Sequence, residues 1–172
     1  MPYNNEKVIF DGKYNSDGNP TLNVTGEWVI LRDFRFTNSN KERVSYKSDT
    51  SDLQTNSGVD FSAPNSKLIN CFIYDNVGVG CGFWNPAVNS ELYGCLIFNN
   101  GYLDSYRNRG TGHNIYTQNL EGTKLIHDNF IFNSVSYGLH AYFTGDSKDP
   151  KRNYQSGFDI QRNISFNNGV LC

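Results

Sequence analysis

Five segments of this chain align with one another without gaps, and this internal repeat limits the possible folds more than any other feature. The segments are EWVILRDFRFTN (27–38), NSKLINCFIYDN (65–76), NSELYGCLIFNN (89–100), GTKLIHDNFIFN (122–133) and GFDIQRNISFNN (157–168). The alignment is anchored on Asp33, Cys71, Cys95, Asn129 and Asn163. An aliphatic residue stands three places before each anchor, and large apolar residues stand one and three places after it. Each segment therefore predicts two short strands joined by a polar corner.

The apolar residues after each anchor alternate with a variable position, and a period of two is typical of a β-strand. The recurring aromatic residues, such as Phe98 and Phe132, are predicted to point inward and to form an internal aromatic ladder. The position between the apolar columns, which holds Ile97 and Ser165 in two of the segments, is predicted to point outward.

Successive anchors are 38, 24, 34 and 34 residues apart, and the extra length falls in polar stretches at 39–57, 101–112 and 143–156. These stretches are interpreted as insertions of variable length on a fixed coil. A parallel β-solenoid explains this pattern, because coils about 4.8 Å apart place equivalent residues on top of one another. Helical spacing of apolar residues is missing, and a sandwich or jelly roll would not require five segments in register. The fold class expected is all-β, a parallel β-helix of about six coils forming a single domain over 1–172.

A third strand per coil is predicted after each repeat, and its outer face is the candidate site. With Val59, Phe83, Ile115 and Leu139 pointing inward, two outward columns follow. The first column is Asp60, Trp84, Tyr116 and His140, and the second is Ser62, Pro86, Gln118 and Tyr142. The insertion 101–112 leads directly into this face. Its polar side chains Asp104, Tyr106, Arg107 and Arg109 are expected to overhang the groove.

The two chain ends suggest further coils. Residues 7–12 and 21–24 are predicted to belong to a first coil, and 169–172 to begin another strand of the exposed face. A solenoid end with an uncovered core normally needs a cap. We therefore expect either that the β-helix is a fragment truncated at its C-terminus or that another chain covers the C-terminal coil.

Charge and composition narrow the class of partner. Fifteen Lys and Arg residues against seventeen Asp and Glu residues give a net charge of -2, so no nucleic-acid partner is expected. No apolar segment is long enough to cross a membrane, and the N-terminal MPYNNEKVIF lacks the pattern of a signal peptide. The expected partner is soluble, with no membrane involvement.

Several motifs resemble a known family. The runs VIFDG, WVILRDFRFTNS, LINCFIYDN, GFWNPAVNSELYGCLIFNNG, RGTGHNIYTQN and YGLHAY are similar to the right-handed parallel β-helix repeat proteins of the pectate-lyase-like superfamily, in an uncharacterised bacterial branch. The resemblance covers nearly the whole chain. It implies a right-handed β-helix, a polysaccharide ligand or substrate, and an extracellular or periplasmic location. Because lyases, hydrolases, epimerases, esterases and tailspikes share this fold, it leaves the activity open.

A lyase acting on an acidic glycan is the favoured activity. Such an enzyme must neutralise the substrate carboxylate, remove the adjacent proton and protonate the leaving oxygen. Arg109 or Arg107 is assigned as the neutraliser, His113 or His140 as the base, and Tyr116 as the acid. The alternative for His140 and Tyr116 is an exposed polar stack that supports the sheet. A structural, hydrogen-bonded role is an equal alternative for His113.

Two other functions stay open. A glycoside hydrolase needs two carboxyl groups about 5–9.5 Å apart, and the face supplies Asp60, with Asp104 from the insertion as the second. A non-catalytic carbohydrate-binding, structural or adhesin β-helix needs only flat rings and polar groups. Trp84, Tyr116, Gln118 and Tyr142 would serve substrate binding in all three cases.

Metal and redox signals are few. The loop 145–153 holds Asp146 and Asp149, which could bind Ca²⁺ with the help of carbonyl groups or could simply be solvated. No other cofactor is expected, and no metal-ligand motif places a metal in the candidate site. Cys71 and Cys95 share the anchor column, so a disulfide is sterically feasible, but two reduced thiols are favoured slightly.

Overall fold

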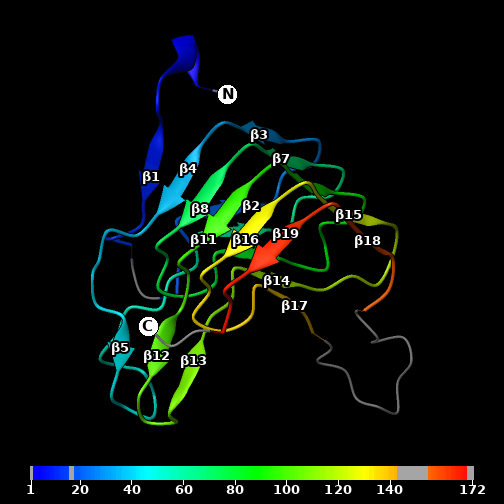
Figure 1. The fold of residues 1–172 in the computed structure, drawn as a ribbon. Coiled ribbons are helices and arrows are strands. Elements are labelled where there is room, and N and C mark those ends of the chain that lie inside the picture. Colours follow the sequence, from blue (N-terminus) through cyan, green and yellow to red (C-terminus); the bar gives the residue numbers. More distant parts are fainter. Residues whose placement is uncertain (1, 16–17, 143–154, 170–172) are drawn as a thin grey trace.

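The chain folds into a parallel β-helix, as predicted. The computed structural model describes residues 2–15, 18–142 and 155–169 (Figure 1). Sheet A contains β1 (Ile9–Asp11), β4 (Arg35–Thr37), β8 (Phe72–Tyr74), β11 (Leu96–Phe98), β16 (Phe130–Phe132) and β19 (Ile164–Phe166). Sheet B contains β2 (Leu22–Val24), β6 (Val59–Phe61), β9 (Cys81–Phe83), β14 (Ile115–Thr117) and β17 (Leu139–Ala141). Sheet C contains β3 (Ile30–Arg32), β7 (Lys67–Ile69), β10 (Glu91–Tyr93), β15 (Lys124–His127) and β18 (Phe158–Gln161).

The chain visits the sheets in the order A, B, C and then returns to A, so that each circuit forms one coil. Within each sheet, all neighbouring strands are parallel. Apart from the 3-10 turn η1 (Tyr3–Asn5), the described residues contain no helix, and none of their segments is a helix that could cross a bilayer.

Every connection from sheet C to sheet A consists of two residues, and the first of them has a left-handed backbone. These first residues are Asp33, Asn70, Gly94, Asp128 and Arg162, with φ between 51° and 65°. The second residue turns inward, as the buried Cys71, Cys95 and Asn129 show. Asn and Asp tolerate the left-handed region better than most residues, which explains the polar corners of the repeat.

The predicted register of the first segment is wrong by one residue. Arg35 pairs with Phe72, and Leu31 pairs with Leu68. Asp33 is therefore the equivalent of Asn70 rather than of Cys71, and Phe34 takes the place of the anchor. The other four segments have the predicted register.

The predicted direction of the side chains in sheet A is also wrong. Ile73, Ile97 and Ile131 are buried, whereas the large apolar residues on either side of each, aromatic except for Leu96, point outward. Alternation alone does not say which set of side chains lies inside. The buried corner residue decides this, because Cys95 and Ile97 are two positions apart and so share a face.

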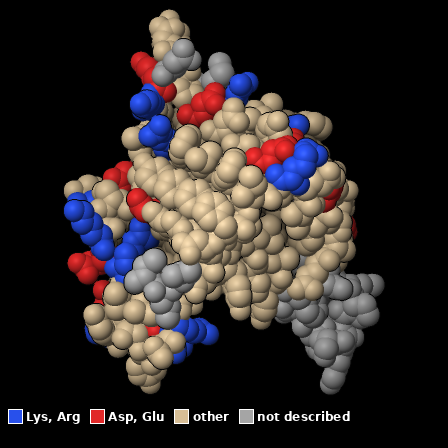
Figure 2. Space-filling view, in the orientation of Figure 1, with Lys and Arg blue, Asp and Glu red and all other residues tan. Residues whose placement is uncertain are grey.

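The aromatic residues instead form a ladder on the outside of sheet A. Tyr74, Phe98, Phe132 and Phe166 stack at centroid separations of 5.2, 4.9 and 5.1 Å. The surface over the strands β8, β11 and β16 is free of charged groups in Figure 2, with charges gathered at its margins.

Polar ladders tie neighbouring coils together at two corners. Asn76 donates to Asn100 of the next coil at 2.9 Å. Asn100 donates at 2.8 Å to Asn114, which lies across the insertion of the same coil. At the C-to-A corner the Cys71 backbone N–H donates to the Cys95 sulfur at 3.4 Å, and both cysteines are free thiols. The reduced alternative favoured from the sequence is the one that the structure has.

The insertions between sheets A and B form a small sheet of their own. It contains β5 (Val44–Ser45), β12 (Tyr102–Asp104) and β13 (Arg109–Thr111), with β12 and β13 antiparallel. At the far end of the β-helix, β18 and β19 each have one neighbouring strand. The covering of this coil by another chain stays a prediction.

Candidate functional site

The outer face of sheet B brings together most of the side chains that the sequence singled out. Tyr116 on β14 lies directly beside His140 on β17, as predicted. The neighbour of Tyr116 on β9, however, is Gly82 rather than Trp84. The predicted register of this coil is therefore wrong by two residues. Trp84 instead continues the ladder after β9, where its N–H donates to the Phe61 carbonyl, so it belongs to the column of Gln118 and Tyr142.

Gly82 is required by its two neighbours. A Cβ atom at this position would lie 2.6 Å from the Asp60 carboxylate oxygen Oδ1 and 2.6 Å from the indole ring of Trp84. The Trp84 ring thus folds across the space above Gly82 and meets the Tyr116 ring at a centroid distance of 5.3 Å. Burial raises the pKa of Asp60 above its ordinary value, and the same Oδ1 atom is buried without a hydrogen-bond partner among the described residues.

His113 and His140 form a hydrogen-bonded pair. The Nε2 atom of His113 lies 3.0 Å from the Nδ1 atom of His140, and the Tyr137 backbone N–H donates to His113 Nδ1 at 3.3 Å. A neutral imidazole carries one N–H, so His113 must carry its proton on Nε2 and donate it to His140. His140 then carries its own proton on Nε2, which leaves that N–H to donate elsewhere.

The corner before β14 explains how His113 reaches this face. Sequence parity placed His113 inward, but Asn114 takes the buried position and joins the amide ladder. His113 therefore turns outward. Burial, and secondarily the neighbouring His140, lower the pKa of His113 to about 4. Burial also lowers the pKa of His140, so both imidazoles are neutral at pH 7.

Aromatic rings surround the histidine pair. His113 stacks on Tyr116 at 5.5 Å, and His140 meets Tyr116 edge-on at 5.3 Å. Tyr137 and Tyr142 contact His140 from two further directions at 5.0 and 5.3 Å. Burial, and secondarily Tyr142, raise the pKa of the Tyr116 hydroxyl, so it is protonated at neutral pH.

A shallow hollow opens beside these rings. It has a volume of about 390 Å³, and its lining includes Trp84, His113, Tyr116 and Gln118. Flat rings and an amide beside an open hollow suit a sugar ring, whose faces are apolar and whose edge carries hydroxyl groups.

The charged residues of the insertion lie apart from the histidine pair. Arg107 is bound to Asp104 by an ion pair of 2.7 Å and donates to the Ser48 carbonyl at 2.6 Å. Asp104 is buried, and Arg109 lies opposite it in the β12–β13 hairpin. Within the described part of the chain, no contact joins these three residues to His113, Tyr116 or His140. The structure thus gives Asp104 and Arg107 a role in holding the hairpin.

Sequence reasoning missed one residue behind the site. Lys124 on β15 is fully buried, and its ammonium group contacts the carbonyl oxygens of Phe83, Trp84 and Gln118. Burial lowers the pKa of Lys124 to about 7. A signal existed, because Lys124 occupies the inward column that holds the buried serines Ser66 and Ser90 in the preceding coils.

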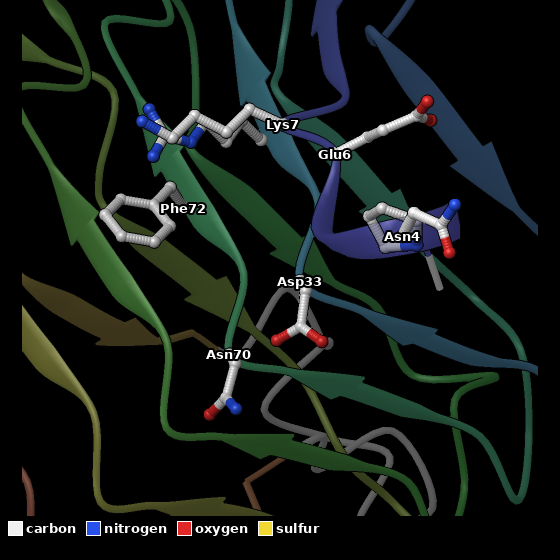
Figure 3. Close-up of a pocket in the computed structure, with 8 residues that line it drawn as sticks. Asn4, Glu6, Lys7, Asp33, Asn70 and Phe72 are labelled. Carbon is white, nitrogen blue, oxygen red and sulfur yellow. The ribbon is translucent and has the colours of Figure 1, made fainter.

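A second hollow lies at the N-terminal end of sheet A. It has a volume of about 560 Å³. Figure 3 shows Glu6, Lys7 and Asp33 at its rim, with the side chains of Glu6 and Lys7 pointing in different directions. Glu6 and Lys7 are exposed, and their charges do not converge on a common point. This hollow therefore offers a weaker site than the face of sheet B.

The acidic loop considered for Ca²⁺, with Asp146 and Asp149, lies outside the described residues. Among the residues that the structure describes, no group of three or more His, Cys, Asp or Glu side chains could hold a metal ion.

Fold and face together define a class: a parallel β-helix with an aromatic and histidine-bearing groove on one sheet. No family model, no curated protein and no solved structure matches this chain. The pectate-lyase-like resemblance thus stays a resemblance.

Proposed function

We propose that the protein acts on a polysaccharide bound along the outer face of sheet B, and that it cleaves an acidic glycan by β-elimination. The single observation that carries this proposal is the contact between His113, His140 and Tyr116. Two groups that can move protons touch a protonated phenol there, beside a hollow lined by rings.

The proposed roles follow from the protonation of these groups. β-Elimination transfers the proton next to the carboxylate to a base, forms the carbon–carbon double bond and expels the glycosidic oxygen, which takes a proton from an acid. Tyr116, protonated at neutral pH, is assigned as the acid. His140 is assigned as the base, and it can accept the proton at Nδ1 once the hydrogen bond from His113 is released. Arg109, exposed and four residues before His113, is assigned to the substrate carboxylate.

A non-catalytic carbohydrate-binding or adhesin function is the second candidate. It is favoured by the contacts of Arg107, which is committed to Asp104 and so is not available to a uronate. A binder needs only the rings and amides of the face. Hydrolysis has less support, because Asp60 is the only carboxylate among the described residues of the cluster. An extracellular or periplasmic location belongs to the same proposal, since the resemblance implies it.

The proposal is tested by incubating the protein with pectate, alginate and glycosaminoglycans and following the ultraviolet absorbance of the unsaturated uronate product. Cleavage should be lost in His140→Gln and Tyr116→Phe. His127→Gln is the matched control, because His127 lies on β15 in sheet C, away from the face. If no substrate gives product, but one polysaccharide retards the protein in affinity electrophoresis and Trp84→Ala abolishes this retardation, the binding function replaces the lyase.

A further inference from the structure

A lysine ammonium group lies inside the β-helix, directly behind the candidate site. The Nζ atom of Lys124 lies 2.7 Å from the Trp84 carbonyl oxygen, 2.7 Å from that of Gln118 and 3.1 Å from that of Phe83. An ammonium group has three N–H donors, so each carbonyl takes one of them. A cation–π contact with the Phe83 ring, at 4.3 Å, adds to this environment.

The three carbonyl groups belong to the segments that carry the rings and the amide of the site. Trp84 follows β9 and Gln118 follows β14, and both side chains line the hollow on the outer face. Lys124 itself comes from sheet C. Its side chain therefore reaches across the interior and joins two neighbouring coils at the point where their functional side chains emerge.

Loss of one proton would change this arrangement. A neutral amine has two N–H donors and a lone pair, so one of the three carbonyl groups would face the lone pair instead of a donor. The Phe83 carbonyl also accepts from the Gln118 N–H and the Thr117 hydroxyl, and the Trp84 carbonyl from the Ala87 N–H. Among the described residues, Lys124 is the donor to the Gln118 carbonyl. A buried carbonyl without a donor is destabilised, so the Gln118 peptide group would tilt to find another partner. Since the peptide groups follow Trp84 and Gln118, such a tilt would move these side chains relative to each other.

We propose that Lys124 is a positioning residue of the sheet B face, and that its charge state sets the relative placement of Trp84 and Gln118 and thereby the affinity for a glycan. The first part stands on the structure of the face alone. The second part, on glycan affinity, rests on the function proposed above. The charged state, with all three carbonyls bound, is the state that binds.

Several titratable groups lie near Lys124, so a pH-dependent change of the face must be assigned by mutation. Cys81 is the group whose charge would act on Lys124, and burial raises the pKa of its thiol, so it is protonated. Burial raises the pKa of Asp60 and of Tyr116 relative to their ordinary values, whereas it lowers the pKa of His113 and His140. A change in the face near pH 7 is therefore assigned to Lys124 by its absence from Lys124→Met.

Trp84 itself provides the readout. The chain has two tryptophans, and Trp28 is exposed, so Trp28→Phe leaves Trp84 as the only tryptophan. Emission of this variant should change with a midpoint near pH 7, and the change should be absent in Trp28→Phe with Lys124→Met. Lys67→Met is the matched control, because Lys67 lies on β7, is paired with Glu91 and is exposed. It should leave the titration unchanged.

Pectate affinity is measured on the same variants. We expect binding to weaken about three- to tenfold as the pH rises through 7, the effect of losing one hydrogen bond, and this pH dependence should vanish in Lys124→Met. If the emission titrates through Lys124 while pectate and other uronates do not bind, the positioning role is retained and the proposed function fails instead.

Three outcomes would overturn the positioning role. In the first, the emission of Trp84 does not change near pH 7. In the second, the emission changes to the same extent in Lys124→Met. In the third, Lys67→Met removes the change as strongly as Lys124→Met does. If Lys124→Met does not fold, the role of Lys124 is tested by carbon NMR of the lysine side chains in the Trp28→Phe protein. A Lys124 signal that titrates together with Trp84 emission supports the role, and one that titrates with the surface lysines refutes it.

Discussion

Phe98 and Phe132 stack on the outside of the β-helix, with ring centroids 4.9 Å apart and ring planes 3° from parallel. Each ring covers the face of the next, so the ladder shields apolar surface without lying in the core. The buried layer behind it consists of Ile97 and Ile131, which belong to neighbouring coils. Packing inside and stacking outside thus reinforce the same register.

This arrangement predicts an inverted order of mutational costs. Ile131→Ala should lower the free energy of unfolding by about 2–4 kcal/mol, because it leaves a cavity in a filled core. Phe132→Ala should cost less, about 1–2 kcal/mol, because a half-exposed ring loses stacking and only part of its burial. Urea unfolding measures both values. A larger cost for Phe132→Ala would mean that the ladder lies inside after all.

Gly82→Ala should disturb the site and spare the fold. The added methyl group would meet Asp60 and the Trp84 ring at 2.6 Å, and the ring is the part that can move. We expect a shift in tryptophan emission and weaker glycan binding, with a loss of stability of about 1–2 kcal/mol. Gly26→Ala is a suitable control, because a Cβ there meets only one side-chain atom, at 3.6 Å. Unchanged Trp84 emission in Gly82→Ala would contradict the packing described above.

His113 should make the protein less stable in mild acid. Its pKa is about 4 in the folded state and about 6.5 in an unfolded chain, so the unfolded state binds more protons between these values. The stability that comes with a neutral His113 is fully present above pH 6.5 and is lost as the pH falls toward 4. After allowance for the partial exposure of His113, we expect the free energy of unfolding to fall by about 1–2 kcal/mol over this range.

The comparison that isolates this contribution is the pH dependence of unfolding for the wild type and for His113→Gln. The two curves should diverge between about pH 6.5 and 4, apart from the titration of carboxylates common to both. His127→Gln serves as the control on sheet C. Parallel curves for His113→Gln and the wild type would show that His113 is not held neutral.

Arg107→Ala should destabilise the insertion without affecting glycan binding. It removes the cation of the ion pair with Asp104, so the carboxylate of Asp104 loses the side-chain partner that holds the hairpin. Proteolysis within 101–112 should become faster. Arg109→Ala should leave the hairpin intact and weaken uronate binding. If Arg107→Ala abolishes binding while the fold is retained, the ion pair must open in the complex.

Much of the fold could be predicted because a β-helix repeats its sequence wherever it repeats its structure. Cys95, Asn129 and Asn163 fall in one column since each fills the same inward corner. The first coil was misjudged because Asp33 resembles the corner residues in type, although it occupies the left-handed position before them. A polar residue suits both positions, so residue type alone could not distinguish them.

The candidate site could be predicted in part for a related reason. The prediction that Tyr116 and His140 lie side by side is confirmed, because regular strands preserve register. The predicted positions of Trp84 and His113 are wrong because each lies next to a corner, where alternation stops. The sequence does not point to Lys124, since a lysine is normally expected at the surface. Its burial depends on three carbonyl groups from two other strands, and no local pattern announces them.

The two-residue turn from sheet C to sheet A has the same length in every coil, whereas the connection from sheet A to sheet B varies. All five turns share this length, while the connections from A to B range from 6 to 21 residues, including the one that builds the β12–β13 hairpin. Residues added to the connections from sheet A to sheet B leave the stacked strands in place. The insertions 39–57 and 101–112 can therefore be replaced by segments of another length or sequence while the stacked strands keep their register.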